Sequence, residues 1–198
     1  MNPVDYAQAA RLAYHKPPDI GNLGSASRAI LQTLEGETII AFPGSNNLAC
    51  WLADMDVWIR DVPGMGFVHA GFHDAWKKIA DGVAAKVGSQ KVVFTGHSLG
   101  GALAIIAGAA MCLIGKPPLA VYAFEPPRVS IDNTISKLLA DNHVDVFLYR
   151  KGFDVVPMIP RILHSWQHCG QLINIGEPVL PVPNIEDHDI NRVIEALG

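Results

Sequence analysis

One segment near the middle of the chain constrains the fold more than any other. It is a short apolar run, residues 91–95, that leads into Gly96-His97-Ser98-Leu99-Gly100 and then into an alanine-rich run, residues 99–113. The first run has the continuous apolar character of a buried strand, and the second has the length and composition of a buried helix. Since Cβ atoms would collide across so tight a strand-to-helix turn, glycines are the residues that the turn requires on both sides of its tip.

The serine at the tip of this turn is the candidate nucleophile. Such a turn exposes the Ser98 hydroxyl and points the first amides of the following helix at a developing oxyanion. A glycine-rich turn with an incidental serine is the alternative interpretation, but the strand and the helix on either side match the context that the chemistry needs. We therefore expect Gly96, His97 and Gly100 to form a nucleophile elbow around Ser98.

The rest of the chain alternates between strand and helix patterns, with no repeat, low-complexity tract or domain linker. The expected strands are 29–34, 38–42, 91–95, 119–124, 144–149 and 171–175, and the expected helices are 3–14, 73–87, 99–113 and 187–197. The first two strands read as a hairpin, and the alternation after it favours parallel pairing. We expect one domain over residues 1–198, with an α/β fold whose central sheet is mixed but mainly parallel.

Charge and cysteine content argue against several classes of protein. The net charge is −4 and no basic face is evident, so nucleic acid is not an expected partner. The N-terminus lacks the basic and apolar regions of a secretory signal, and the low-charge stretch 100–115 is too short to span a membrane. A cytoplasmic location is therefore the default expectation, with export by another route left open. No cofactor or metal is expected, because the three cysteines form no zinc pattern and no carboxylate or thiol lies at matching spacing from His69, His73 and His97.

A serine hydroxyl needs a positioned base, and the base needs an acid that fixes its tautomer. In folds with such an elbow, both groups follow the serine along the chain. Asp154 comes directly after the expected strand 144–149, whereas Asp132, Asp141 and Asp145 lie on the approach to that strand. We therefore expect Asp154 to be the acid, with a solvated loop carboxylate as the alternative interpretation.

Three histidines remain as candidates for the base. The base should lie beyond the last strand, on a loop that reaches over the serine. His188 fits, because it follows strand 171–175 and a proline-rich loop, while His168 and His164 come before that strand. We expect His188 to be the base, with the other two as lesser candidates. The alternative interpretation of His188 is a polar residue at a helix start, with Asp187 or Asp189 as the cap.

Several segments, in order along the chain, resemble the class 3 (fungal-type) lipases of the α/β-hydrolase fold. The matching segments are Phe42-Pro43-Gly44-Ser45 leading to Trp51-Leu52-Ala53-Asp54, Val68-His69-Ala70-Gly71-Phe72, the elbow 96–101, Pro126-Pro127-Arg128-Val129 leading to Tyr149-Arg150, Asp154-Val155-Val156-Pro157, Trp166-Gln167-His168-Cys169-Gly170 and Asp187-His188. The resemblance covers nearly the whole chain. It implies an α/β-hydrolase fold, and it makes Asp154 the family's acid and His168 a structural residue.

The resemblance also implies an oxyanion hole. Its two donors would be the backbone N–H groups of Ser45, which follows the family's F-x-G, and of Leu99, which follows the nucleophile. The chain departs from the family at two places. Pro43 stands where the family usually has arginine, and Glu125-Pro126-Pro127 stands where the family often has small residues.

The residues after the oxyanion segment are dense in large apolar side chains. They are Leu48, Trp51, Leu52, Met55 and Trp58. In the lipases that this chain resembles, a short helical lid lies at this place, and a core-packing helix is the equally supported alternative. Either way we expect apolar surroundings for Ser98, suited to acyl chains.

The expected function is that of a serine carboxylic-ester hydrolase, a lipase or esterase that cleaves acyl esters through an acyl-enzyme. A phospholipase A or an acyltransferase could use the same triad, and a non-catalytic binding protein on this fold is the least favoured alternative. The expected partners are a lipid or small ester substrate and, transiently, a lipid surface.

Overall fold

A computed structural model describes residues 1–45, 58–88, 91–160 and 165–198 of the protein. Within these residues, seven strands form one sheet, in the order β1-β2-β3-β6-β7-β8-β9. In that order they are β1 (Ile20–Gly21), β2 (Arg28–Leu34), β3 (Glu37–Phe42), β6 (Val92–His97), β7 (Ala120–Phe124), β8 (Asp145–Lys151) and β9 (Leu172–Ile175). The first three strands pair antiparallel, and every pairing from β3 to β9 is parallel. The expected mixed, mainly parallel sheet is confirmed.

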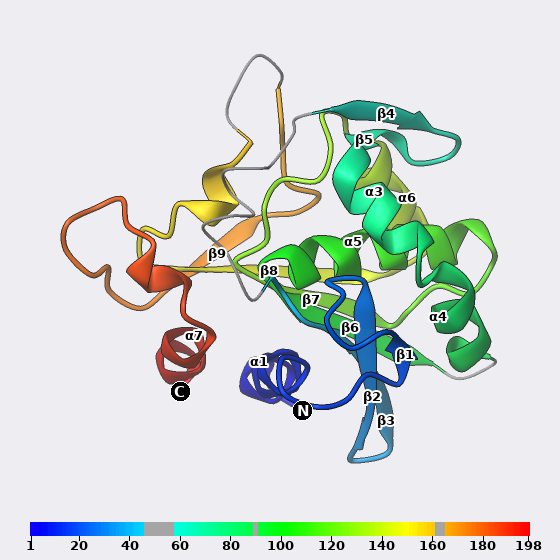
Figure 1. Ribbon diagram of the computed structural model, residues 1–198. Helices are drawn as coiled ribbons and strands as arrows, with labels where there is room; N and C mark the ends of the chain where they lie inside the picture. The colour runs from blue at the N-terminus through cyan, green and yellow to red at the C-terminus, as the bar shows by residue number, and fades with distance from the viewer. Residues whose placement is uncertain (46–57, 89–90, 161–164) are drawn as a thin grey trace.

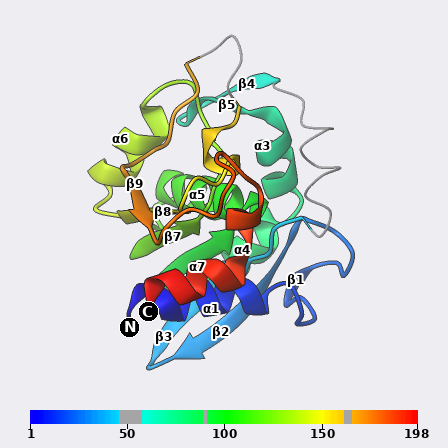
Figure 2. The ribbon, with the colours of Figure 1, turned by 90° about the vertical axis from the view of Figure 1, so that its left-hand side faces the viewer.

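Helices cover both faces of the sheet (Figure 1). One face carries the first and last helices, α1 (Pro3–Leu12) and α7 (Ile190–Leu197), which lie side by side so that the two ends of the chain are neighbours (Figure 2). The other face carries α3 (Ala70–Lys77), α4 (Ala80–Val87), α5 (Leu99–Leu113) and α6 (Thr134–Asp141). Two 3₁₀ turns, η1 (Val156–Met158) and η2 (Glu186–His188), and a small hairpin of β4 (Ile59–Val62) with β5 (Gly66–His69) complete the described elements.

The sheet separates two hydrophobic cores, and the elbow segment lies between them. All six residues of β6 are buried, as are all residues of α5 except the last, Leu113. Such burial on every side explains why these two runs have no polar face in the sequence. β6 is the middle strand of the seven, so the turn that follows it is held from both flanks.

The predicted hairpin and first helix are confirmed. Ile30 pairs with Ala41 and Leu34 with Glu37, so β2 and β3 are joined by a turn at Glu35-Gly36. The Asn2 side chain accepts a hydrogen bond from the Asp5 backbone N–H, and the Asp5 carboxylate accepts one from that of Asn2. This reciprocal capping fixes the start of α1.

The single helix predicted over 73–87 is wrong, because the chain breaks into α3 and α4 at Lys78 and Ile79. The apolar stripe continues across the break, since Trp76, Ile79 and Val83 are all buried. The second helix packs so closely against β1 that a Cβ on Gly82 would lie 2.7 Å from Ile20 Cγ2. The spacing of apolar residues predicted the buried stripe correctly, but it carries no information on this long-range contact.

Candidate active site

Ser98 occupies the turn between β6 and α5, with φ of 59° and ψ of −127°. A positive φ is uncommon for a residue with a side chain, and it persists only where the surroundings hold it. Here the surroundings are two close backbone approaches. A Cβ on Gly96 would overlap the carbonyl oxygen of Gly100, and a Cβ on Gly100 would overlap that of Phe42 at the end of β3. The glycines therefore serve both the turn itself and its packing against the neighbouring strand.

The segment that follows β3 passes directly over this turn. A Cβ on Gly44 would lie 2.9 Å from the carbonyl oxygen of His97 and 3.0 Å from Ser98 Cβ. Ser45, the next residue, lines the same cavity as Ser98. Leu99 is the first residue of α5. In the same first turn, the amides of Gly101 and Ala102 donate hydrogen bonds to the Ser98 carbonyl oxygen. The two expected oxyanion donors thus belong to segments that meet at Ser98.

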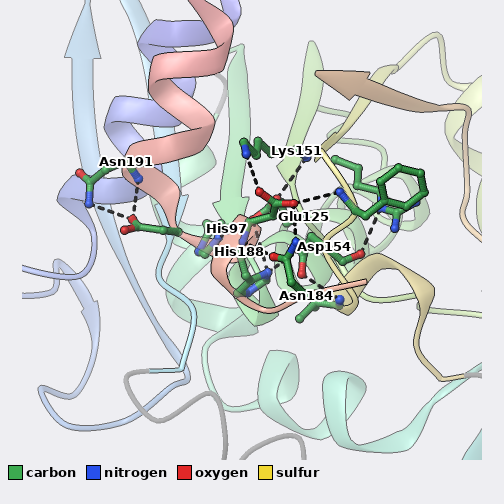
Figure 3. Close-up of polar contacts among 12 residues, drawn as sticks. His97, Glu125, Lys151, Asp154, Asn184, His188 and Asn191 are labelled. Carbon is green, nitrogen blue, oxygen red and sulfur yellow. Dashed lines mark hydrogen bonds and ion pairs between the residues drawn. The ribbon is translucent and has the colours of Figure 1, made fainter. Parts of the chain in front are cut away.

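His188 and Asp154 form a buried pair at the carboxyl ends of the strands (Figure 3). The Nδ1 atom of His188, in η2, lies 2.6 Å from Oδ2 of Asp154, which follows β8. The other carboxylate oxygen, Oδ1, accepts a hydrogen bond from the Val156 backbone N–H at 3.0 Å. Because both oxygens are bound, the carboxylate has a fixed orientation toward the imidazole.

His188 and Ser98 line the same cavity. Ser98 Oγ and His188 Nε2 are both buried, and neither has a hydrogen-bond partner within the described part of the chain. Both residues line one cavity of about 520 Å³, together with Tyr14, His97 and Ser45. Hydrogen bonds between catalytic groups are often long before a substrate binds, so two unpaired atoms facing one cavity suit a serine and its base.

The loop that carries His188 is anchored through its neighbour, Asp187. The buried Asp187 carboxylate pairs with the Lys151 ammonium and accepts hydrogen bonds from the backbone N–H of Phe153 at 3.1 Å and from Asn184 Nδ2 at 2.9 Å. Burial alone would raise the pKa of this carboxyl group, but the lysine and these hydrogen bonds outweigh it and hold the pKa below its ordinary value. Asp187 was expected only as a candidate helix cap. The cap of α7 is instead Asp189, which accepts from the Asn191 backbone N–H.

Glu125 is a residue of this site that sequence reasoning missed. It follows β7 directly and is fully buried, with its Oε2 atom 3.3 Å from His188 Nδ1 and 3.4 Å from His97 Nε2. Burial and then the negative charge of Asp154 raise the pKa of Glu125 well above its ordinary value. The signal in the sequence was the departure from the family pattern at residues 125–127, directly after β7, the strand that neighbours β6.

His97 lies beneath the serine. Its Nδ1 atom is 2.7 Å from the hydroxyl of Tyr14, and its Nε2 atom is 3.4 Å from Oε2 of Glu125. Burial, and then the nearby His188, lower the pKa of His97 well below its ordinary value, so this ring is neutral. A neutral, doubly bound ring serves as a support rather than as a base.

The other candidates lie elsewhere. His168 is bound to the Pro157 carbonyl oxygen at 2.8 Å, and burial lowers its pKa. Asp132 accepts from the backbone N–H groups of Phe67 and Thr134, while Asp141 pairs with Lys137 at the surface and Asp145 begins β8. His164 lies outside the described residues, as do the lid candidates Leu48, Trp51, Leu52 and Met55. Trp58 is described, and 71% of its surface is exposed.

Among the described residues, the side chains most able to hold a metal are His97, Glu125 and His188, whose ligand atoms lie within 4.8 Å of one another. Their hydrogen bonds to one another and to Tyr14 and Asp154 account for this closeness without an ion. His69 is buried and stacks on Phe72, with ring centroids 4.0 Å apart.

The fold and the site define a class before any relative is considered: an α/β-hydrolase with a serine at the tight turn between its central strand and the helix that follows. Comparison agrees, since the family described as Lipase (class 3) matches residues 39–164. The chain belongs to this class 3 lipase family. It is 31% identical over 142 residues to a secreted mono- and diacylglycerol lipase 1 of Fusarium solani, covering 67% of this chain and 42% of that relative.

Two further comparisons support the family and the fold. A secreted mono- and diacylglycerol lipase A of Penicillium cyclopium is 28% identical over 150 residues, covering 71% of this chain and 48% of the relative. The solved triacylglyceride lipase of Rhizomucor miehei superposes with a TM-score of 0.76 at 19% identity, covering 93% of this chain and 91% of that one. The chain therefore spans less than half the length of the two curated relatives while matching nearly all of the solved fold.

The expectation of a cytoplasmic location is wrong. Relatives in Fusarium and Penicillium are named as secreted lipases, which points to export instead. None of the described helices is long and apolar enough to cross a membrane.

Proposed function

We propose that the protein is a serine carboxylic-ester hydrolase that cleaves acyl esters, acylglycerols among them, with Ser98, His188 and Asp154 as its triad. One observation carries the proposal. His188, bound to Asp154 through Nδ1, lines the same cavity as Ser98, and its Nε2 atom has no hydrogen-bond partner among the described residues. We also propose that residues 1–198 act as a single hydrolase domain, since both cores are built on one sheet.

In the proposed reaction, Ser98 Oγ attacks the ester carbonyl carbon while His188 Nε2 takes the hydroxyl proton. The Asp154 carboxylate holds the imidazole through Nδ1 and stabilises the imidazolium that forms. The backbone N–H groups of Ser45 and Leu99 hold the oxyanion, and one such donor is typically worth about 3 kcal/mol. His188 then protonates the leaving alcohol, and water that the same histidine activates hydrolyses the acyl-enzyme.

The described surroundings of Ser98 differ in part from the expected apolar surface. The lining of the cavity includes Arg11 of α1, His15 of the turn after α1 and Asn191 of α7. We propose that the polar alcohol part of the substrate lies against these residues. The apolar residues expected to accept the acyl chain lie mostly outside the described residues.

Two measurements test the proposal. A fluorophosphonate probe should label the protein at Ser98, because the elbow presents an activated hydroxyl. Ser98→Ala should abolish both labelling and the hydrolysis of p-nitrophenyl esters of graded chain length. Labelling that persists in Ser98→Ala would place the nucleophile elsewhere. Rates on mono-, di- and triacylglycerol and on phosphatidylcholine then rank the substrates, and product analysis in the presence of a second alcohol distinguishes hydrolysis from acyl transfer.

A further inference from the structure

Two carboxyl groups, not one, face the same nitrogen of His188. Oδ2 of Asp154 lies 2.6 Å from Nδ1, and Oε2 of Glu125 lies 3.3 Å from it (Figure 3). The two acids come from neighbouring parallel strands, since Glu125 follows β7 and Asp154 follows β8, while Ser98 follows the next strand over, β6. The carboxyl ends of parallel strands meet at one edge of a sheet, so either strand can deliver an acid to this histidine.

The backbone at Glu125 is held in a conformation that its residue type disfavours. Its φ is +52°, in the left-handed region that glycine adopts without steric cost and glutamate does not. Its backbone N–H donates to the Tyr149 carbonyl at 2.7 Å, and its Oε1 atom accepts from the Lys151 N–H at 3.1 Å. Residues in such conformations persist only where the surrounding structure holds them, and they gather at active sites. The side chain is thus locked in place beneath the histidine.

The groups around Glu125 are themselves neutral. Burial raises the pKa of the Tyr14 hydroxyl, so Tyr14 keeps its proton and shares a hydrogen bond with His97 Nδ1. The other ring nitrogen of the neutral His97, Nε2, lies 3.4 Å from Glu125 Oε2. The Glu125 and Asp154 carboxyls both approach the Nδ1 atom of His188, at 3.3 and 2.6 Å, and ionisation of two carboxyl groups so close together in a buried site is disfavoured. This closeness favours one proton for the pair.

We propose that Glu125 is a second acid of the site: a positioning residue that shares one proton with Asp154 and replaces it as the carboxylate partner of His188 when Asp154 is removed. This inference rests on the proposed function. In the intact protein, the neutral Glu125 donates to the Asp154 carboxylate, and that carboxylate accepts from His188 Nδ1. The proton that leaves Ser98 goes to His188 Nε2 and later to the leaving alcohol, so Glu125 neither gains nor loses a proton during the reaction.

Removal of Asp154 changes the charge on Glu125. The raised pKa of Glu125 has two main causes, burial and the negative charge of Asp154, and the second disappears in Asp154→Ala. Glu125 then ionises more readily, with an imidazole N–H already 3.3 Å away.

The titratable and charged groups that face Glu125 come from several surrounding elements. They are Tyr14 of the segment after α1, His97 of β6, Lys151 of β8, Asp154, and Asp187 and His188 of η2.

A double-mutant cycle tests the proposal with Glu125→Gln, Asp154→Ala and the combined variant. Glutamine has the shape of a neutral glutamate but cannot ionise, so Glu125→Gln alone should lower kcat by about tenfold or less. In the Asp154→Ala background, the same substitution should lower kcat by about 100-fold or more, because it removes the last carboxylate of the site. The residual activity of Asp154→Ala should rise with pH as Glu125 ionises, and this dependence should be missing from the double variant. Equal losses in both backgrounds, with unchanged pH profiles, would leave Glu125 a merely structural residue and overturn the proposal.

Infrared spectroscopy gives a readout that does not depend on activity. At pH 7 the wild-type protein should show the carbonyl stretch of a buried, protonated carboxyl group. Glu125→Gln should lose this band, and in Asp154→Ala the band should disappear at a lower pH than in the wild type, as Glu125 ionises. Glu186→Gln, at an exposed glutamate on the turn that carries His188, is the matched control and should keep both the band and the activity. Absence of the band from the wild-type protein would overturn the shared proton. An inactive wild-type protein that shows the band would overturn the proposed function instead.

The variant Glu125→Gly serves as a control that separates a loss of activity from a loss of folding. Glycine relieves the positive φ at this position but leaves the Lys151 N–H without its acceptor, so the variant should fold and melt somewhat below the wild type. It should nevertheless show the same steep loss of kcat as Glu125→Gln when combined with Asp154→Ala. If Glu125→Gly caused no loss of kcat relative to its parent protein in either background, no second acid would be needed and the proposal would fail.

Discussion

The Nδ1 atom of His188 lies 2.6 Å from the Oδ2 atom of Asp154, although the two residues are 34 positions apart in the sequence. His168, the nearest rival candidate for the base that is described, instead binds the Pro157 carbonyl oxygen. His188→Ala should therefore lower kcat by several orders of magnitude, about 10⁴-fold or more, because a serine without its base loses most of its nucleophilicity. His168→Ala should leave kcat within about tenfold and lower the melting temperature, since it removes one half-buried hydrogen bond. Steady-state kinetics and thermal melts of the two variants measure this, and the reverse pattern would make His168 the base.

The close contact between the elbow and β3 predicts that activity requires a glycine at position 100. In Gly100→Ala, the new Cβ would overlap the Phe42 carbonyl oxygen, and backbone cannot move aside as a side chain can. The turn that holds Ser98 must shift, so activity should fall by about 100-fold or more, since misplacement by about 1 Å can cost that much. Gly170→Ala is the matched control, because its Cβ would meet neighbours only at 3.5 Å and beyond. Full activity in Gly100→Ala would show that the elbow tolerates repacking.

The anchor of the His188 loop should be sensitive to both mutation and acid. Asp187→Asn leaves the Lys151 ammonium without its charged partner, and breaking such a buried pair costs about 3–5 kcal/mol of unfolding free energy. The folded-state pKa of Asp187 lies below its unfolded value of about 3.9, so its contribution is fully present above that pH and is lost as the pH falls through the folded pKa. Urea unfolding of the wild type and the variant at several pH values should show a difference that shrinks below about pH 4. A difference that stays constant with pH would contradict this assignment.

Glu125 should give the opposite pH dependence. Its folded-state pKa is raised, so the folded protein holds a proton that the unfolded chain releases above about pH 4.3. The wild type should therefore lose stability relative to Glu125→Gln as the pH rises from that value toward the folded pKa. The measurement is the difference in unfolding free energy between the two proteins from acid to neutral pH. A difference that moves in favour of the wild type as the pH rises would mean that Glu125 is ionised in the folded state.

The exposed Trp58 gives a prediction about lipid surfaces. Trp58 precedes β4, and with Phe67 of β5, which is 46% exposed, it presents large apolar side chains on one small hairpin. Trp58→Ala should lower the rate on emulsified substrate several-fold, because an apolar anchor at the interface is lost. The rate on soluble short-chain esters should be appreciable in both proteins and unchanged by the substitution. A wild-type protein that is nearly silent on monomeric esters would indicate a lid that closes fully over Ser98.

Sequence by itself determined the elements whose signals are local. The buried β6, the elbow and the buried α5 could be predicted because a continuous apolar run, two glycines and an alanine-rich stretch occur next to one another. The hairpin of β2 and β3 and the capped start of α1 also depend on residues only a few positions apart. The chain order of this fold also reduced the number of candidate acids and bases, because the acid and the histidine both follow the serine along the chain.

Only the tertiary structure determined which residues from separate strands and loops contact one another. It broke the predicted helix at Lys78 and Ile79, and it made Asp187 an anchor for the histidine loop instead of a helix cap. It also placed Glu125 against the same nitrogen as Asp154, although nothing in the local pattern at 125–127 says which histidine lies above it. The physical reason is that parallel strands far apart in the sequence end at one edge. Contacts there depend on strand order and side-chain reach, which periodicity and motifs do not encode.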